Sequence, residues 1–430
     1  MSPSVAAPAF FLAVVVILVV CRLVCLVAVR LGQPPVVGEM IAGVLLGPSL
    51  LGLVLPGVQA AVFPEGIKSL LYVGGQLGLV VFMFGAGYEF NVRGVRGSGR
   101  AVGAISLAGT AVPLALGIAV AVLGNRWTHI FLPTVSPLVS AAFVGVALAI
   151  TAFPMLARII TERGLAGTRF GSLALACGAV DDVLAWLLLA IVLSLHAGST
   201  GPVVLAIGGA ALFAVVLATV GKRLLARVTT SERLSGDQRL LVTMMALFAA
   251  AWFTDLIGLY AVFGAFCLGI AFPRNDAAAA VLAKIMPIGR IVFLPLFFTY
   301  SGLNTRFALL ADPKLLLFSG VCVVAAVAGK FGACWGAARL AGEPQPVAVR
   351  VGALINARGL MQLIALNVGL QAGIVSPALF TVLVVVALVT TVMTAPLLSW
   401  LDRRDSRRYA DPVNPSVVIH RDLSAQGLDS

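Results

Sequence analysis

Two adjacent aspartates, Asp181 and Asp182, lie in the stretch GAVDDVLAW, within residues 170–195, which are otherwise almost wholly apolar. Lys330 and Arg358 are likewise surrounded by apolar residues. A charged side chain at the centre of a bilayer costs about 2.5–3.5 kcal/mol on an insertion scale, so four of them cost on the order of 10 kcal/mol. Such residues usually mark an ion pathway, a proton relay or a binding site. The alternative interpretation is a structural ion pair that fixes the packing of helices.

The spacing of the two aspartates limits what they can do together. Adjacent residues on a helix point about 100° apart, so Asp181 and Asp182 do not share a face. One carboxylate can face an aqueous pocket and hold a cation, while the other faces a neighbouring helix and pairs with Lys330. A site that holds either a cation or a proton, but not both at once, is the physical basis of an exchanger. The pattern alone leaves open which aspartate takes which role.

Two further apolar runs contain residues that interrupt a helix. VALAITAFPMLARII holds Thr151 and Pro154, and proline removes a backbone donor and clashes with the preceding turn. GALINARGLMQLIALNVGL holds Asn356 and Arg358, followed by a glycine. Interrupted spans in corresponding places of two halves predict a transporter site, and we expect Arg358 to offset the negative end of a half-helix. For Pro154 alone, an ordinary helix kink is the alternative.

Membrane-spanning helices must position these residues. The 430-residue chain is 60% hydrophobic and 11% charged, whereas soluble domains average about 45–50% and about 25%. Apolar runs of roughly 20 residues predict membrane spans. We predict about thirteen, at 7–29, 35–55, 70–90, 101–124, 138–157, 170–196, 201–221, 239–257, 259–273, 288–304, 315–338, 348–370 and 376–400. The predicted fold class is therefore an all-α integral membrane protein.

The formal net charge of +12 follows this predicted topology and does not indicate nucleic acid binding. With the N-terminus outside, most basic residues fall in the inner connections, among them Arg22, Arg158 and Arg290, and in the tail. The outer connections hold only Lys68, Arg126, Arg306 and Lys314. This asymmetry predicts a cytoplasmic C-terminus and favours contact of the inner face with anionic lipid. The polar residues 401–430 predict a short disordered cytoplasmic tail without a soluble regulatory domain.

No pattern predicts a cofactor. The six cysteines all lie in predicted spans and form no CxxC motif or Cys/His cluster, so we expect small buried hydrophobes and no metal centre of that kind. Glu39 and Glu89 lie near the ends of spans and are expected to be interfacial. Nothing in the pattern predicts a step that breaks a covalent bond, and we do not expect an enzyme.

Taken together, these motifs resemble the monovalent cation:proton antiporter-2 family, which includes bacterial sodium/proton exchangers, Kef-type potassium efflux proteins and plant cation/proton exchangers. The resemblance covers roughly residues 8–400. It rests on seven stretches in family order, which are GQPPVVGEMIAGVLLGPSLLG, ITAFPMLARII, GAVDDVLAWLLLA, IGLYAVFGAFCLGIAFPR, FLPLFFTYSGLNT, AGKFGACW and NARGLMQLIALNVGL with the following SPALFTVLVVVALVTTVMTAPLL.

The resemblance implies an inverted-repeat fold with two crossing unwound helices and a linker helix at about 201–221, usually assembled as a homodimer. Panel helices at about 7–90 and 239–304 would support core helices at about 101–196 and 315–400. The core would move by an elevator form of alternating access.

The resemblance also implies roles for individual residues. Asp182 matches the ion-binding aspartate, which takes the monovalent cation or the proton. Asp181 matches a preceding position that is aspartate in electrogenic sodium/proton exchangers, and Lys330 matches the lysine that pairs with it. The crossing unwound segments would contain Thr151, Pro154, Asn356 and Arg358.

The sequence thus predicts an electrogenic antiporter that exchanges Na⁺ or K⁺ for protons across the cytoplasmic membrane. One departure from the family is that many relatives carry glutamate where this chain has Leu360, while the polar residue here is Gln362. Two alternatives stay open. A channel-like potassium efflux protein would carry current without proton counterflow, and an exporter of a small organic solute would use the same aspartates.

Overall fold

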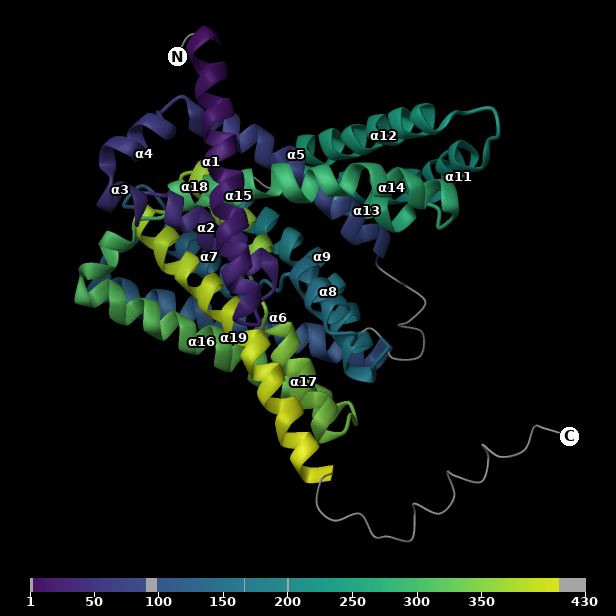
Figure 1. Ribbon diagram of the computed structural model, residues 1–430. Helices are drawn as coiled ribbons and strands as arrows, with labels where there is room; N and C mark the ends of the chain where they lie inside the picture. The colour runs from purple at the N-terminus through teal and green to yellow at the C-terminus, as the bar shows by residue number, and fades with distance from the viewer. Residues whose placement is uncertain (1–2, 90–98, 166, 199–200, 410–430) are drawn as a thin grey trace, which may run out of the picture.

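The computed structural model describes residues 3–89, 99–165, 167–198 and 201–409, which form an all-helical bundle (Figure 1). No strand occurs in these ranges, and the predicted fold class is confirmed. The elements are α1 (Pro3–Arg30), α2 (Pro35–Leu46), α3 (Leu51–Val54), α4 (Pro56–Val62), α5 (Ile67–Glu89), α6 (Gly99–Thr128), α7 (Pro137–Ala149), α8 (Phe153–Glu162), α9 (Arg169–Ala197), α10 (Gly201–Val216), the π-helix η2 (Leu217–Gly221), α11 (Lys222–Thr230), α12 (Gly236–Leu256), α13 (Ala261–Ala271), α14 (Asp276–Ile288), the π-helix η3 (Gly289–Phe293), α15 (Leu294–Leu303), the 3₁₀ helix η4 (Phe307–Ala311), α16 (Pro313–Leu340), α17 (Gln345–Ile355), α18 (Leu360–Gln371) and α19 (Pro377–Tyr409).

Twelve helical stretches in the described ranges are long and apolar enough to cross a membrane. The remaining predicted span, 259–273, corresponds to α13, which is apolar but only 11 residues long. Tyr260 precedes α13 with a φ of 65°, outside the helical region, and fixes its start. Phe272 is extended (φ −66°, ψ 137°), as expected for a residue before a proline, and ends it.

Two predicted boundaries are wrong. The span predicted at 288–304 begins instead at Asp276, because the Asn275 side chain accepts a hydrogen bond from the Ala278 amide and caps α14. Pro287 does not end this stretch, since the chain continues through the π-helical turn η3 into α15. The last helix continues to Tyr409, beyond the predicted end at residue 400. The rest of the predicted tail, residues 410–430, lies outside the described residues.

The helices pack in two sets. In the panel set, α5 packs against α13 and α15, α2 packs against α1 and α15, and α12 packs against α13. In the core set, α6 packs against α7 and α16, while α9 contacts α7, α8 and α17, and α19 contacts α16 and α17. The stretch α10–η2 lies between the sets in the chain; α10 packs against α9 of the core set and α12 of the panel set, and η2 packs against α13.

Glycine residues permit the closest helix crossings, and these crossings lie within a set. A Cβ on Gly302 of α15 would overlap the carbonyl of Gly43 of α2, both in the panel set. A Cβ on Gly117 of α6 would lie 2.7 Å from the Cα of Gly145 of α7, both in the core set. Among the described residues, no glycine approach below 3 Å joins a panel helix to a core helix. Each set is therefore tightly interlocked, whereas side chains mediate the contact between the sets.

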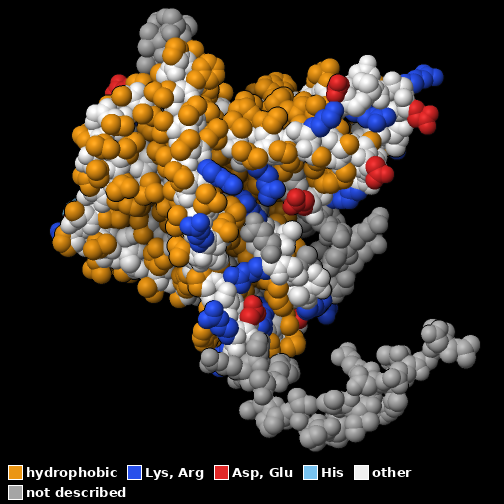
Figure 2. Space-filling view, in the orientation of Figure 1, with side chains coloured by type: hydrophobic (Ala, Val, Ile, Leu, Met, Phe, Trp, Pro, Cys, Tyr) orange, Lys and Arg blue, Asp and Glu red, His pale blue; other side chains and the backbone are white. Residues whose placement is uncertain are grey.

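The surface fits a membrane environment. Figure 2 shows one face covered largely by hydrophobic side chains, with Lys and Arg gathered across its middle and lower right. On α1, Phe11, Val15 and Val19 are each more than half exposed. Large apolar side chains exposed in such number are stable in lipid but not in water.

Candidate functional site

The two interrupted helices cross at their interruptions. The backbone leaves the helical state at residues 150–152, between α7 and α8, and at residues 356–359, between α17 and α18. The amide of Ala152 in the first gap donates a hydrogen bond to the carbonyl of Ala357 in the second, at 3.2 Å. Pro154 occupies the first turn of α8, where its missing N–H costs little. Gly359 has a φ of +116°, which L side chains rarely adopt, so a glycine is required at the second gap.

A buried ion pair lies beside this crossing. The Lys330 ammonium on α16 lies 2.9 Å from Oδ2 of Asp181 on α9, and both side chains are at most 1% exposed. The Thr151 hydroxyl, in the first gap, donates to the same Oδ2 at 2.7 Å. Lys330 also donates to the carbonyl of Ala149, at the C-terminal end of α7, at 2.7 Å. The predicted pair of Lys330 with one aspartate is therefore present, and that aspartate is Asp181.

Asp182 lies in a different environment from its neighbour. It is 1% exposed, and its Oδ1 accepts a weak hydrogen bond from the Phe153 amide at the start of α8, at 3.4 Å. A helix N-terminus carries partial positive charge, which favours a carboxylate there. The other oxygen, Oδ2, is buried and has no hydrogen-bond partner. The two carboxylates thus have different partners, as their angular separation requires, and each keeps one buried oxygen without a partner, Oδ1 of Asp181 and Oδ2 of Asp182.

Arg358 stabilises the other side of the crossing. Its guanidinium is fully buried and donates to the carbonyls of Ala147 on α7 and Ala326 on α16, at 3.2 and 3.1 Å. The last carbonyls of a helix have no partner within it and carry partial negative charge. Arg358 therefore lies at the negative end of the half-helix α7, as the sequence predicts. Asn356 makes only a long contact to the Met393 sulfur, at 3.8 Å, and its side-chain oxygen is buried without a partner.

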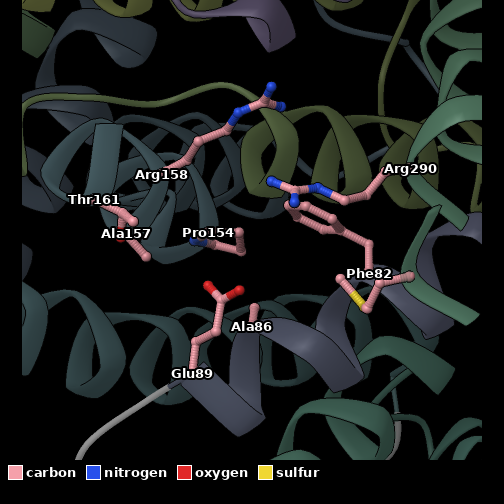
Figure 3. Close-up of a pocket in the computed structure, with 9 residues that line it drawn as sticks. Phe82, Ala86, Glu89, Pro154, Ala157, Arg158, Thr161 and Arg290 are labelled. Atoms are coloured by element: carbon pink, nitrogen blue, oxygen red, sulfur yellow. The ribbon is translucent and has the colours of Figure 1, made fainter. Parts of the chain in front are cut away.

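Two cavities lie at the arginine-bearing end of the crossing. The smaller one, of about 120 Å³, lies between α5, α8 and the α14–η3 stretch. Figure 3 shows Arg158 and Arg290 extending toward one another across it, with Pro154 on its wall and Glu89 pointing inward. The larger one, of about 580 Å³, also includes Arg158 and Arg290 and is bordered by α1 and α2. Since Pro154 directly follows the residue whose amide contacts Asp182, the smaller cavity approaches the carboxylate site.

Sequence reasoning misplaced three of the arginines at this end. Arg22, Arg158 and Arg290 were expected in connections between spans, but they lie within α1, α8 and η3 and line the cavities. For Arg22 and Arg290 a signal existed, since they fall inside the spans predicted at 7–29 and 288–304. Glu39 was expected to be interfacial; it lines the larger cavity, and its Oε2 is buried without a hydrogen-bond partner.

The remaining candidates take no part in the cluster. The Gln362 amide donates to the Leu383 carbonyl at 3.2 Å, and its side-chain oxygen is buried without a partner. All six cysteines are free thiols. The described ranges contain no group of three or more His, Cys, Asp or Glu residues that could hold a metal ion.

Comparison with known proteins identifies the family. Residues 15–401 match the family described as sodium/hydrogen exchanger, transmembrane. The chain belongs to this family. The Na⁺/H⁺ antiporter NhaS4 of Synechocystis is 36% identical over 398 residues, which cover 89% of this chain and 95% of that protein. Family membership supports monovalent cation/proton antiport as the activity of this multi-pass membrane protein.

Other relatives are longer than this chain. Cation/H⁺ antiporter 17 of Arabidopsis thaliana is 33% identical over 407 residues, covering 91% of this chain and 48% of that protein. K⁺/H⁺ antiporter 1 of Saccharomyces cerevisiae is 31% identical over 434 residues, covering 96% of this chain and 48% of that protein. The chain therefore spans about half the length of these plant and yeast relatives.

A solved structure shares the fold. The sodium proton antiporter MjNhaP1 from Methanocaldococcus jannaschii superposes with a TM-score of 0.67 at 15% sequence identity. The match covers 93% of this chain and 97% of that one. The helices of this chain thus have the arrangement of a known antiporter.

Proposed function

We propose that this protein exchanges Na⁺ or K⁺ for protons across the cytoplasmic membrane, with Asp182 binding either the cation or the proton. The observation that carries the proposal is the state of its carboxylate. Asp182 is buried at the crossing, one oxygen faces the positive end of α8, and the other oxygen has no partner. A buried carboxylate oxygen without a partner costs free energy, which a bound proton or cation would recover. No covalent step is part of the proposed cycle, so the protein acts as a transporter and not as an enzyme.

Charge accounting supports an electrogenic exchange if Lys330 takes part. In the proton-loaded state Asp182 is neutral and the pair of Asp181 with Lys330 sums to zero. If the cation binds both carboxylates, the pair of Asp181 with Lys330 breaks and Lys330 releases its proton. The two carboxylates, the neutral lysine and the cation then carry a total charge of −1. Two protons then leave for each cation that enters the site, and one net charge moves per cycle. If Lys330 kept its proton, the exchange would be one for one and electroneutral.

Elevator-type alternating access is supported by the packing. The tight glycine crossings lie within the panel set or the core set, so the core set can move as one body. At the end away from the cavities, Asn367 of α18 donates to the Ser301 hydroxyl of α15 at 2.7 Å. Ser301 lies on the same helical stretch as Arg290, about 16 Å further along at 1.5 Å per residue. At the other end the cavities open beside Arg158 and Arg290, although the Gln33 amide still donates to the Val392 carbonyl of α19 at 3.1 Å, and this arrangement supports an inward-facing state with the N-terminus outside. We further propose that the protein works as a homodimer through its panel set.

The test uses the purified full chain in liposomes that contain an internal pH dye. Na⁺ and then K⁺ are added outside, with the membrane potential clamped or free. The native protein is expected to move protons in response to at least one cation, and clamping the potential should raise the rate if charge moves. Asp182→Asn should abolish this response, because a neutral amide takes up no proton and lacks the negative charge that would hold a cation in exchange for one.

A matched control separates loss of the site from loss of folding. Asp312→Asn replaces an exposed aspartate that caps α16, and it should retain proton movement. A potential-driven cation flux that persists without any proton movement would contradict antiport and support a channel. Proton movement that responds only to an organic solute would support the exporter.

A further inference from the structure

The larger cavity contains arginine side chains that take no part in the proposed ion exchange. It is a crevice of about 580 Å³ between α1 on one side and η3 with the start of α15 on the other. Arg22 projects from α1 and Arg290 from η3, and both side chains are exposed to it. The surrounding wall includes Leu18, Ile291 and Pro295. The crevice thus combines two guanidinium groups with an apolar surface, within the 300–1,000 Å³ typical of ligand sites.

The two arginines have no counter-charge at contact distance. Neither Arg22 nor Arg290 forms an ion pair or hydrogen bond with any residue in the described ranges. Both lie within helices that can cross the membrane, Ala6–Arg30 and Asp276–Leu303. A cation at membrane depth is costly unless it reaches water or an anion. Glu39 of the same crevice attracts Arg290 electrostatically but makes no ion pair with it, so a further anion or water can still bind to the two guanidinium groups.

The geometry favours an anion that lies between helices. Arg290 belongs to a π-helical turn, a local feature that is frequent at functional sites. Arg158 of α8 lines the same crevice, and Figure 3 shows Arg158 and Arg290 directed toward each other. Glu39 lines the larger cavity and Glu89 the smaller one, so three arginines face two carboxylates and the balance is positive. Guanidinium groups bind phosphate oxygens in a bidentate geometry.

We propose that this crevice binds one anionic phospholipid, with its phosphate between Arg22 and Arg290 and an acyl chain along Leu18 and Ile291. A lipid fits better than a free anion because most of the remaining wall is apolar and because the crevice borders α1, whose outward face is exposed to lipid. Arg22 and Arg290 belong to panel helices, whereas Arg158 belongs to a core helix. A phosphate that also reaches Arg158 would link the two sets, and this consequence rests on the proposed function.

The binding site is tested without any transport measurement. The full chain is purified in a neutral detergent, stripped of lipid and titrated with phosphatidylglycerol, with phosphatidylcholine of the same acyl chains, or with inorganic phosphate. Bound lipid is counted by native mass spectrometry, and the thermal unfolding midpoint is followed. Phosphatidylglycerol is expected to bind in a one-to-one ratio and to raise the midpoint, and the other two additives to do so far less.

Variants locate the effect. Arg22→Gln with Arg290→Gln should weaken the apparent affinity for phosphatidylglycerol roughly 25-fold, about fivefold for each charge removed. Replacement of both by lysine should retain most of the affinity, which shows that the fold tolerates change there. The matched control, Arg126→Gln with Arg306→Gln, removes two exposed arginines from the opposite end and should bind as the native protein does.

Three results would overturn the proposal. Unchanged affinity in the double glutamine variant would place the lipid elsewhere. Equal binding of phosphatidylcholine would show that charge is irrelevant, and a full effect of inorganic phosphate alone would identify a free anion instead of a lipid. Since these readouts are independent of ion exchange, they stand whether or not the antiport proposal holds.

Discussion

Replacement of Lys330 by glutamine should leave the Asp181 carboxylate buried without its ammonium partner. In the native protein the two charges lie 2.9 Å apart, with side chains at most 1% exposed. The Thr151 hydroxyl would remain as the only hydrogen-bond donor to Asp181 among the contacts described here. The glutamine side chain is shorter than that of lysine, but its amide can still donate a hydrogen bond to the carbonyl of Ala149.

The expected loss of stability follows from this geometry. Two unit charges at 2.9 Å attract each other by about 6 kcal/mol at an effective dielectric constant of 20. Desolvation of both ions offsets most of that attraction, so the intact pair contributes little net stability. Removal of one partner keeps the desolvation cost of the other, and it should lower the free energy of unfolding by about 3–5 kcal/mol.

The assay is a double-mutant cycle on the purified full chain, with unfolding followed in detergent at neutral pH. Asp181→Asn combined with Lys330→Gln should recover most of the stability, because neither charge is then left alone. The coupling energy should reach at least about 2 kcal/mol, well above the few tenths found for independent sites. Lys314→Gln, at the exposed start of the same helix, is the matched control and should have little effect. Additive effects of Asp181→Asn and Lys330→Gln would refute the reasoning.

Two further predictions concern packing and access. Gly302→Ala should lower the free energy of unfolding by about 1–3 kcal/mol, because its Cβ would overlap the Gly43 carbonyl and separate α2 from α15. Gly320→Ala is the control and should cost nothing, because no atom lies within 4 Å of the added Cβ. Thermal unfolding of both variants checks this prediction. In a background without native cysteines, Thr161→Cys should react with an impermeant thiol reagent from the arginine-bearing side, because Thr161 is exposed and lines the smaller cavity. Ser301→Cys, at a position that is 2% exposed, should not react, and labelling of Ser301→Cys alone would mean that the opposite end is open.

The carboxylate site was predictable from sequence because its parts obey strong local rules. Pro154 inside an apolar run allowed either a kink or a break, and the second interrupted run, which holds Asn356 and Arg358, favoured a break. Charges in apolar runs are costly, so Asp181, Asp182 and Lys330 stood out against their surroundings. Their separate environments followed from the 100° between neighbouring positions on a helix. The assignment of the Lys330 partner to Asp181, however, came from family resemblance and required coordinates to verify.

The cavities were not predictable, for a physical reason. Hydropathy averages over about 20 residues and reports whether a stretch can cross the membrane, but not which side chains face a crevice between helices. Arg290 shows this limit, since its direction depends on a π-helical turn for which we found no sequence signal. The early start at Asp276 was not predicted for a related reason, because a single capping residue, Asn275, sets it and an average over about 20 residues does not register one residue.

Both interruptions are short breaks in the helical backbone, but the charged side chains around them differ. This difference bears on where a cation can bind. At the first gap, Lys330 and Arg358 meet the negative end of α7, while Asp182 meets the positive end of α8. At the second gap, α18 begins with no acidic residue in its first turn, and Gln362 occupies the third position. Among the described residues, a carboxylate therefore meets the start of α8, whereas the first turn of α18 contains none. We infer that the cation is held on the α8 side, and that α18 contributes neutral backbone to the site.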